Sequence, residues 1–454
     1  MRKADKRLLA EGNNEFAAWL RVCRHFFPRL PIWLKKMADP RNQMYITYNQ
    51  AVLIMMCIMK NISGVESMRS MNDAFSEDVA IYNLSIAADD PSLFEMPDWQ
   101  TVNNYLEKLD VHELEKIRRL MMVALLRTKQ FDRYKFQGRW TIILDGTGIA
   151  YFKERHCQHD LVTKITNPET GETRLLYYHK VLEAKMVLAP GIVISIDTEF
   201  IENEQENVTK QDCELRAAER LLERLKKNYP RLPILILGDG LYATMPFMKM
   251  CSERNWHYIL NLKEGRQNSL FEDYDLLVND EKFNNRIKNL CGEENGIGAF
   301  ANRMDEISNK PQICNVYEYT HKELENDTLK DKRYVWVTDM RLTKKNLESF
   351  IRKGRERWKI ENEGFNNQKN GIYKIEHLCS REPNAMKAHY LITQISDIIM
   401  QLYLRFDKRV QLLSRTIKDA ARRIEKAFLN TPITSHEKSK ISVRCSMRLQ
   451  ADSS

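Results

Sequence analysis

The sequence has little that would direct it into a membrane or out of the cell. Its longest uninterrupted apolar run, residues 51–59, covers nine positions, whereas a membrane-spanning helix needs about 20. The first residues, MRKADKRLLAEGNNEF, are charged and contain no apolar stretch ahead of a small-residue cleavage site. We therefore expect a cytoplasmic protein without a membrane partner, in which the apolar run forms a buried helix.

Paired cysteines are also lacking. The nine cysteines are odd in number and scattered, and none forms a CxxC pair, which argues against a disulfide framework and a zinc ribbon. The residues His156, Cys157 and His159, with His179 downstream, are acceptable zinc ligands, but their spacing is that of no known finger. Two interpretations stay open, a structural zinc site and a loop with ordinary polar residues, and the spacing favours the loop.

Charge is distributed unevenly along the 454 residues. The formal net charge is +9, with residues 401–454 at +7 and residues 1–40 at +5, so the middle of the chain is slightly acidic. Basic ends around an acidic centre suit a protein that grips a polyanion with its ends and gathers cations in its middle. Two solvated basic helical regions without a partner would give the same pattern.

Apolar residues make up 43% and charged residues 29% of the chain, which is typical of a globular protein of two to four domains. The sequence pattern predicts several short helices in residues 1–135. Within them, Gln100, Asn103, Asn104 and Lys108 could read base edges, or could form the outer face of an ordinary bundle helix. Residues 381–454 read as a basic helical region.

Strand patterns begin at Trp140. The runs 140–144, 177–188 and 191–200 predict three strands, a charged amphipathic helix is expected at 210–227, and strands follow at 232–237 and 257–262 with a helix near 245–251 between them. The order β-β-β-α-β-α-β is that of a ribonuclease-H-like mixed five-stranded sheet. The fold class is therefore α/β, with a core at 136–267, a β-rich insertion at 268–343 and a returning core segment at 344–380, between N- and C-terminal helical regions.

Two aspartates occupy equivalent places in this pattern. Asp145 and Asp239 each follow an apolar strand and precede glycine, in ILDGT and ILGDG. Side chains at that edge of an open sheet converge outside the strand ends. Carboxylates brought together repel unless a cation lies between them, and Mg²⁺ prefers such hard oxygen ligands. Taken alone, either aspartate could also be an ordinary turn or cap residue.

A third carboxylate is predicted on a helix that spans 346–369. Trp358, Glu361, Phe365 and Gln368 share one side of it, so we expect the aromatic residues to press that side on the sheet and Glu363 to point to solvent. Arg357 lies one turn before Glu361 and could orient its carboxylate or grip a phosphate. A surface Arg–Glu pair is the alternative.

Together, ILDGT, GDGLYA (238–243) and RWKIENEGFNNQKNG (357–371) resemble the DDE transposases of bacterial insertion sequences, in the group with a β-rich insertion before the catalytic glutamate. The resemblance spans about 140–380. The last motif is similar to that group's Tyr-Arg-Glu-Lys signature, with Arg357 and Glu361 matching. Gly354 stands at the tyrosine position and Gln368 at the lysine position, with Lys369 one place later.

The resemblance implies that Asp145, Asp239 and Glu361 are the catalytic residues and hold Mg²⁺ or Mn²⁺, with two ions expected. It also implies DNA contacts by Arg357 and Lys369 and base stacking by Trp336 of the insertion, although the apolar strand YVWVTDM favours a core position for that tryptophan. Residues 1–135 would bind DNA and recognise the element's ends. A homodimer is expected to pair two ends.

Three functions remain open from the sequence. The first is a transposase that cleaves DNA at transposon ends and transfers the freed 3′-OH to target DNA. The second is a metal-dependent DNA nuclease that cuts without joining, and the third is a catalytically inactive, transposase-derived DNA-binding protein. All three carboxylates are present, which argues against the third, whereas only the resemblance separates the first two.

Overall fold

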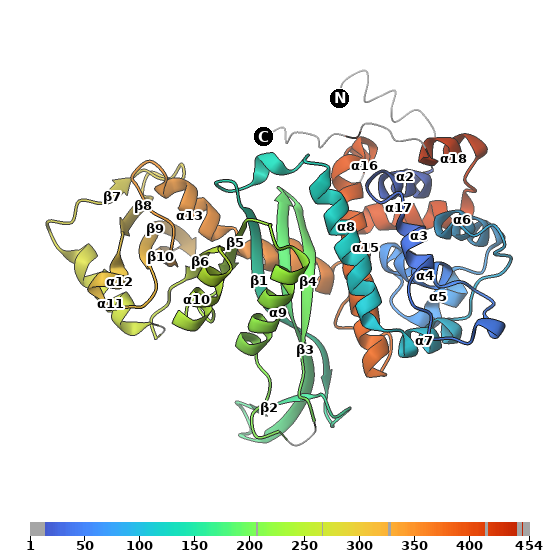
Figure 1. The fold of residues 1–454 in the computed structure, drawn as a ribbon, viewed down its shortest axis with the longest axis horizontal. Helices are drawn as coiled ribbons and strands as arrows, with labels where there is room; N and C mark the ends of the chain where they lie inside the picture. Colours follow the sequence, from blue (N-terminus) through green and yellow to red (C-terminus); the bar gives the residue numbers. More distant parts are fainter. Residues whose placement is uncertain are drawn as a thin grey trace.

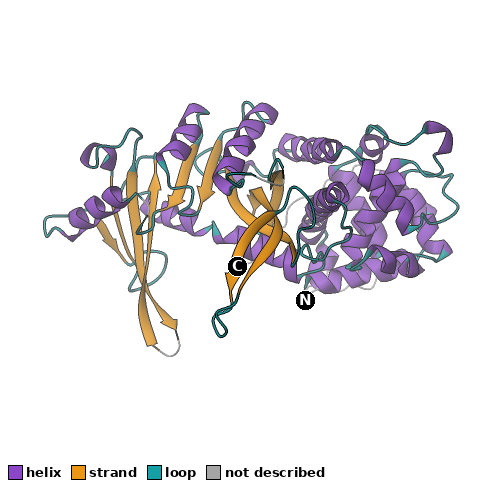
Figure 2. Cartoon of the chain, turned by 90° about the horizontal axis from the view of Figure 1, so that it is seen from below, coloured by secondary structure: helices purple, strands orange, loops and turns teal. Residues whose placement is uncertain are grey.

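The computed structural model describes residues 14–205, 208–265, 267–325, 328–413, 416–442 and 447. Helices gather at one end of the elongated molecule, a twisted sheet lies in the middle, and an insertion with its own helices forms the other end (Figure 1). Seen from below, the strands run through the middle and the insertion, and the helical end contains none (Figure 2).

The helical end combines both ends of the described chain. Its elements are α2 (Glu15–Phe26), α3 (Leu30–Lys35), η1 (Gln43–Tyr45), α4 (Gln50–Ser63), α5 (Met68–Ala74), α6 (Asp78–Ala88), α7 (Trp99–Lys108), α8 (Val111–Arg127) and η2 (Asp132–Tyr134), followed near the C-terminus by α15 (Pro383–Phe406), α16 (Lys408–Leu413), α17 (Ile417–Asn430) and α18 (Ser435–Ser442). The long helix α15 packs against α2, α4, α7 and α8, so it joins the N-terminal helices to the rest of the molecule.

The apolar run at 51–59 lies in α4, as expected. The Asn49 side chain caps this helix by accepting from the N–H of Val52, Gly64 ends it in the left-handed conformation at φ 73°, and every residue between is buried. No helix in the described ranges is, on its own, long and apolar enough to span a membrane; α4 and α5 reach that length only as a pair, bent by 89°.

Asn103, one of the residues that could read base edges, has a structural role instead. Asn103 of α7 is 8% exposed and its Oδ1 lies 3.0 Å from Nε2 of His389 in α15. Gln100, Asn104 and Lys108 are exposed on the same helix. For Asn103, the bundle-helix interpretation is therefore correct.

The predicted five-stranded core is present. It comprises β1 (Trp140–Phe152), β3 (Thr173–Ala189), β4 (Ile192–Ile201), β5 (Ile234–Gly238) and β6 (His257–Asn261), with α9 (Glu214–Asn228) and α10 (Met245–Glu253) as the connecting helices. These strands lie in the order β4-β3-β1-β5-β6, with β1, β5 and β6 parallel and β3 antiparallel to β1 and β4. This is the ribonuclease-H-like mixed sheet expected from the sequence.

The insertion extends this sheet. Its elements are α11 (Asn268–Asn279), β7 (Arg286–Lys288), β8 (Ile297–Ala301), α12 (Met304–Ile307), β9 (Asn315–Glu325) and β10 (Thr328–Thr338). Strand β10 pairs antiparallel with β6, so the described strands form one ten-stranded sheet. Side chains alternate across it: Ile142 and Leu144 join the larger apolar core, whereas Ile143 joins a second core with α13 (Leu347–Arg355) and the insertion.

Two strand predictions need correction. Strand β1 continues to Phe152 rather than ending at Leu144, because its antiparallel pairing with β3 persists after its parallel pairing with β5 has ended at Ile143. Strand β2 (Leu161–Thr166) was not predicted and pairs with the first half of β3. Its last four residues are exposed, and its three apolar residues, Leu161, Val162 and Ile165, do not alternate with polar ones. The β2–β3 hairpin projects away from the body of the sheet (Figure 1).

The single helix expected at 346–369 is broken. Helix α13 ends at Arg355, a turn follows at Glu356 and Arg357, and the chain then forms the π-helical segment η3 (Ile360–Phe365) and the short α14 (Asn366–Asn370). The break allows α13 to pack on β6, β8 and β9 while η3 packs on β1 and β4. Single π turns are rare inside helices and occur often at functional sites.

Candidate catalytic metal site

The sheet register brings two of the predicted carboxylates to the same level. Ile143 of β1 pairs with Leu237 of β5 in parallel, and Asp145 and Asp239 each follow two residues later. One oxygen of each aspartate is held locally: Oδ1 of Asp145 accepts from the N–H of Gly146, and Oδ1 of Asp239 accepts from the N–H of Leu241, both at 2.9 Å. The second oxygen of Asp145, Oδ2, faces the guanidinium of Arg357.

Glu361 reaches the same place through η3. Nη1 of Arg357 lies 3.7 Å from Oδ2 of Asp145 and 3.9 Å from Oε1 of Glu361, so one buried guanidinium bridges carboxylates that are 216 positions apart in the sequence. Gly364 leaves room for the aliphatic part of Lys185, which would lie 3.2 Å from a Cβ there. Close packing of η3 on the sheet thus carries Glu361 toward Asp145.

The helix faces differ in part from those expected, because the helix breaks at Glu356 and Arg357, directly before Trp358, and Glu363 lies in the π segment. Phe365 and Gln368 are buried as predicted, but Trp358 is 49% exposed and stacks on the guanidinium of Arg357 at 4.7 Å. Glu363 does not point fully to solvent, since its Oε2 is buried without a hydrogen-bond partner and burial raises the pKa of its carboxyl.

Several negatively charged side chains act on Asp145 and contribute to its raised pKa. Burial raises the pKa of Asp145 to about 6; Arg357 opposes this rise, whereas Glu361, Asp239 and Glu214 add to it. Three neighbouring carboxylates therefore act on Asp145 at once. A divalent cation would relieve this repulsion and would meet the hard oxygen ligands it prefers, so the residues fit the metal that the sequence implied.

Glu214 was missed by the sequence interpretation. It begins α9, accepts from the hydroxyl of Tyr242 at 3.0 Å and forms a short ion pair with Lys180. A Cβ at Gly146 would lie 2.6 Å from its carboxyl carbon, which explains why glycine follows Asp145. The first turn of an amphipathic helix often carries an acidic residue, so nothing local distinguished Glu214 from a capping charge.

Lys369 lies beside the residues that follow Asp145. It shares a hollow of about 230 Å³ with Gly146, Thr147, Gly148 and Lys180. Its Nζ is paired with Oε1 of Glu376 at 2.8 Å, and a phosphate in the hollow would have to compete with that partner. Contact between Lys369 and DNA therefore stays a prediction.

Trp336 is a core residue in this structure. It is 2% exposed and lies between the rings of Tyr317 and Tyr334, with centroids 5.1 and 5.9 Å away. This burial favours the core position over the base-stacking role that the resemblance implies, and base stacking by Trp336 stays a prediction. A Cβ at Gly354 would lie 2.7 Å from the Trp336 ring, so the tryptophan fills the space beside the position where the family's signature has tyrosine.

This contact predicts that Gly354→Ala destabilises the protein. The added methyl would overlap a ring that is itself fixed on both faces, and overpacking of this kind costs about 1–3 kcal/mol, more than the about 1 kcal/mol that alanine gains in helix propensity. Urea unfolding of wild type, Gly354→Ala, Trp336→Phe and the double variant measures the effect. The smaller phenyl ring should reduce the cost of Gly354→Ala; an equal cost in both backgrounds would contradict the proposed contact.

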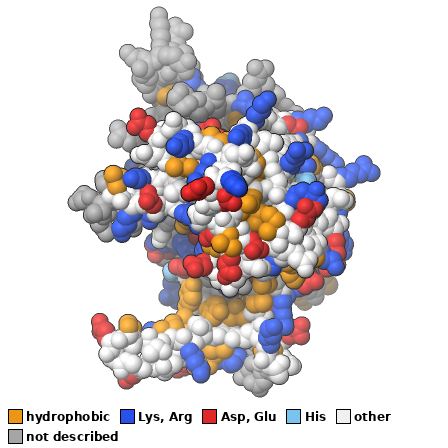
Figure 3. All heavy atoms as spheres, turned by 90° about the vertical axis from the view of Figure 1, so that its left-hand side faces the viewer, with side chains coloured by type: hydrophobic (Ala, Val, Ile, Leu, Met, Phe, Trp, Pro, Cys, Tyr) orange, Lys and Arg blue, Asp and Glu red, His pale blue; other side chains and the backbone are white. Residues whose placement is uncertain are grey.

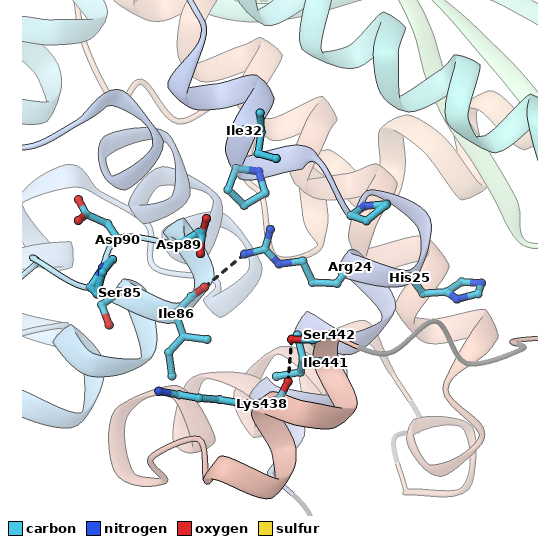
Figure 4. A pocket seen from close by; sticks show the side chains of 13 residues that line it. Arg24, His25, Ile32, Ser85, Ile86, Asp89, Asp90, Lys438, Ile441 and Ser442 are labelled. Atoms are coloured by element: carbon cyan, nitrogen blue, oxygen red, sulfur yellow. Dashed lines mark hydrogen bonds between the residues drawn. The ribbon is translucent and has the colours of Figure 1, made fainter.

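A cleft of about 560 Å³ lies in the helical end, between α2, α3, α6 and α18. Figure 4 shows Arg24 reaching across it, where the guanidinium donates to the carbonyl oxygen of Ile86 at 3.2 Å. Its acidic lining residues, Asp89 and Asp90, are neighbours on the same loop. The cleft shares no residue with the carboxylate site.

A known protein family matches the part of the chain that contains the sheet and this site. The profile of the transposase DDE domain family matches residues 137–396, more than half of the chain and all three predicted carboxylates. Among solved structures, the chain is similar to a piggyBac transposase synaptic complex with hairpin DNA, at 12% identity and a TM-score of 0.40, over 98% of this chain and 87% of that one. No curated protein sequence matches. Since the family match covers the sheet, the insertion and the Glu361 segment, the chain belongs to the family of transposase DDE domains.

Proposed function

We propose that this transposase cleaves DNA at the ends of its own mobile element and joins the freed 3′-OH to target DNA, using Asp145, Asp239 and Glu361 as the catalytic residues. The observation that carries the proposal is that Arg357 bridges Asp145 of β1 and Glu361 of η3, while the charge of Asp239, at the end of β5, acts on Asp145. Two bound Mg²⁺ or Mn²⁺ ions would activate water or a 3′-OH and stabilise the leaving oxygen of an in-line displacement.

The residues of the chain have distinct parts in this reaction. The three carboxylates would hold the metal ions, and Arg357 offsets the charge of two of them, Asp145 and Glu361. With metal ions bound at the carboxylates, the Arg357 guanidinium could bind a phosphate oxygen. Lys369, across the hollow beside Gly146, would hold the backbone on the other side of the scissile bond.

A surface near the site is suited to DNA. Between the end of β1 and the outer half of β3 lies a hollow of about 580 Å³ whose lining includes Lys153, Arg155 and Arg174 together with the half-exposed Tyr151 and Leu175. Seen from the insertion's end, a recess with hydrophobic side chains separates the insertion from the hairpin below (Figure 3). Cations with exposed aromatic and apolar side chains support binding of nucleic acid strands and unstacked bases.

The same proposal assigns the helical residues 1–135 to recognition of the element's ends and the basic C-terminal helices to backbone contacts. Exposed Gln100, Asn104 and Lys108 on α7 have the side chains needed to read base edges. Pairing of two ends requires two protein copies in the complex, so we propose a homodimer on DNA.

An in vitro assay on the element's own ends tests the function. Full-length protein is incubated with labelled end DNA, a target plasmid and Mg²⁺, with EDTA as the matched control. We expect strand breaks at the element's boundary and covalent joining of the 3′ ends to the plasmid, both lost in EDTA. Breaks without joined products would show a nuclease instead, and binding without breaks would show an inactive DNA-binding protein; either result overturns the proposal.

A further inference from the structure

A second group of possible metal ligands lies outside the carboxylate site. His156, Cys157, Asp160 and His179 each offer one ligand atom, and these four atoms all lie within 4.8 Å of one another. The loop between β1 and β2 supplies the first three, and His179 comes from β3, where it pairs with Ala150 of β1. Asp160 was not included when the sequence alone was considered, because an isolated aspartate carries no signal.

We propose that these four side chains form a structural Zn²⁺ site that fixes the base of the β2–β3 hairpin. Sγ of Cys157 lies 3.2 Å from Oδ1 of Asp160 and 3.6 Å from Nε2 of His179, and that nitrogen lies 2.9 Å from the same Oδ1. Tetrahedral zinc, with bonds of about 2.3 Å to sulfur and about 2.0–2.2 Å to nitrogen and oxygen, places its ligand atoms roughly 3.3–3.6 Å apart. Small shifts of the side chains would bring the ligand atoms to the separations that tetrahedral zinc requires.

The first observation that points to a ligand is the burial of the cluster together with one imidazole nitrogen that has no hydrogen-bond partner. Asp160 and His179 are 0% and 2% exposed, and Nδ1 of His156 is buried with no hydrogen-bond partner. Leaving such a nitrogen unpaired costs free energy, and a metal ion would satisfy it. The His156 ring is also held in place, stacked on Phe152 at 4.3 Å.

The second observation is that Asp160 is oriented before any metal arrives. Its Oδ2 accepts from the backbone N–H groups of His156 and Cys157, at 2.6 and 3.1 Å, which turns Oδ1 toward the sulfur and the imidazole. The backbone carbonyl of Asp160 accepts from the side chain of Asn203 at 2.7 Å. These contacts give the ligand the outer support typical of metal sites.

The charge balance and the ligand types both favour zinc. On binding, the thiol of Cys157 releases its proton to solvent, and the thiolate and the Asp160 carboxylate together neutralise the two charges of Zn²⁺, while the imidazoles bind in neutral form. A buried site with no net charge avoids the largest desolvation cost. A thiolate with two imidazoles selects zinc over Mg²⁺, which prefers oxygen ligands and water, so this site would not compete with the carboxylates for their metal.

The test uses the purified full-length protein and needs no catalytic activity. We expect one equivalent of zinc per chain by elemental analysis, and Co²⁺ substitution should give a sulfur-to-cobalt charge-transfer band with the visible bands of tetrahedral cobalt. In Cys157→Ser and His179→Gln we expect loss of the bound equivalent, and in Cys157→Ser loss of the charge-transfer band. The carboxylate site contains no sulfur, so its occupancy does not produce that band.

Two matched variants control for unrelated effects. Cys213→Ser alters an exposed thiol outside the cluster, and His159→Gln alters a neighbouring imidazole whose Nδ1 instead lies 2.9 Å from the carbonyl oxygen of Asn203; both should retain zinc and the cobalt spectrum. Circular dichroism verifies that every variant is folded. Absence of the charge-transfer band in folded wild type, or equal zinc in wild type and Cys157→Ser, would overturn the proposal and leave a metal-free hydrogen-bonded cluster.

Discussion

Asp239→Asn should abolish Mg²⁺-dependent cleavage of element-end DNA while leaving DNA binding within a few-fold of wild type. The amide keeps the shape of the side chain and can still accept the N–H of Leu241, but it removes the negative charge that would hold a cation at the end of β5. Metal-assisted charge stabilisation supplies several kcal/mol, so we expect a loss of about 10³-fold or more. Gel-based cleavage and mobility-shift assays on the same DNA measure both effects.

Asp145→Asn and Glu361→Gln should show the same loss if the three carboxylates act as one site. Glu363→Gln is the matched control, since Glu363 lies two positions from Glu361 in the same π turn and has no part in the proposed chemistry. Cleavage near the wild-type rate in any of the three site variants would remove that residue from the site. An equal loss in Glu363→Gln would show that disturbance of η3, not loss of a ligand, explains the effect.

Stability measurements separate loss of a ligand from loss of folding. The folded-state pKa of Asp145 is raised from 3.8 to about 6, so its ionised form costs stability, and that cost grows as pH rises from about 4 through 6. Asp145→Asn removes it. In EDTA at pH 7.5 we therefore expect the variant to be more stable than wild type by about 1–2 kcal/mol, and the difference should shrink toward pH 4. A variant less stable than wild type at pH 7.5 would contradict this reading of the site.

The sequence predicts those parts of the candidate site that depend on patterns of neighbouring residues. Apolar runs that stop at Asp145 and Asp239 located both aspartates, because parallel strands of similar length end at one edge. The path of β1 beyond Asp145 could not be read in the same way, since its continuation is stabilised by pairing with β3 and not by apolar alternation. Register, rather than composition, determines where that strand ends.

Long-range packing explains the remaining differences. The segment 346–369 has a helical sequence throughout, but it must cover the insertion's strands with α13 and β1 and β4 with η3, so the chain breaks at Glu356 and Arg357. The same packing buries Trp336 over Gly354. Glu214 and Asp160 join their sites only through tertiary contacts. In each case the deciding partner lies far away in the sequence, where a local pattern carries no information.

A buried polar network ties the helical end to the catalytic sheet, and Arg118→Met should break it. Arg118 of α8 is 2% exposed; its guanidinium donates to the Ser195 hydroxyl at 2.9 Å and to Asp197 at 3.2 Å, and it offsets the charge of the fully buried Glu183. Removing one partner from a buried ionic group costs about 3–5 kcal/mol. Urea unfolding at pH 7.5 measures this loss, with Arg422→Met as the control, because Arg422 forms an exposed pair with Asp419 that contributes less than about 1 kcal/mol.

The pH dependence of that loss distinguishes an uncompensated charge from a packing defect. Burial raises the pKa of Glu183, and Arg118 opposes the rise, so the variant should hold its carboxyl at a still higher pKa. A raised folded-state pKa lowers stability increasingly as pH rises, and the gap between wild type and Arg118→Met should therefore be larger at pH 8 than at pH 5. If the difference in the free energy of unfolding stays constant over this range, the lost packing of the arginine side chain explains the destabilisation. The charge of Arg118 would then add little to the stability of the junction between α8 and the sheet.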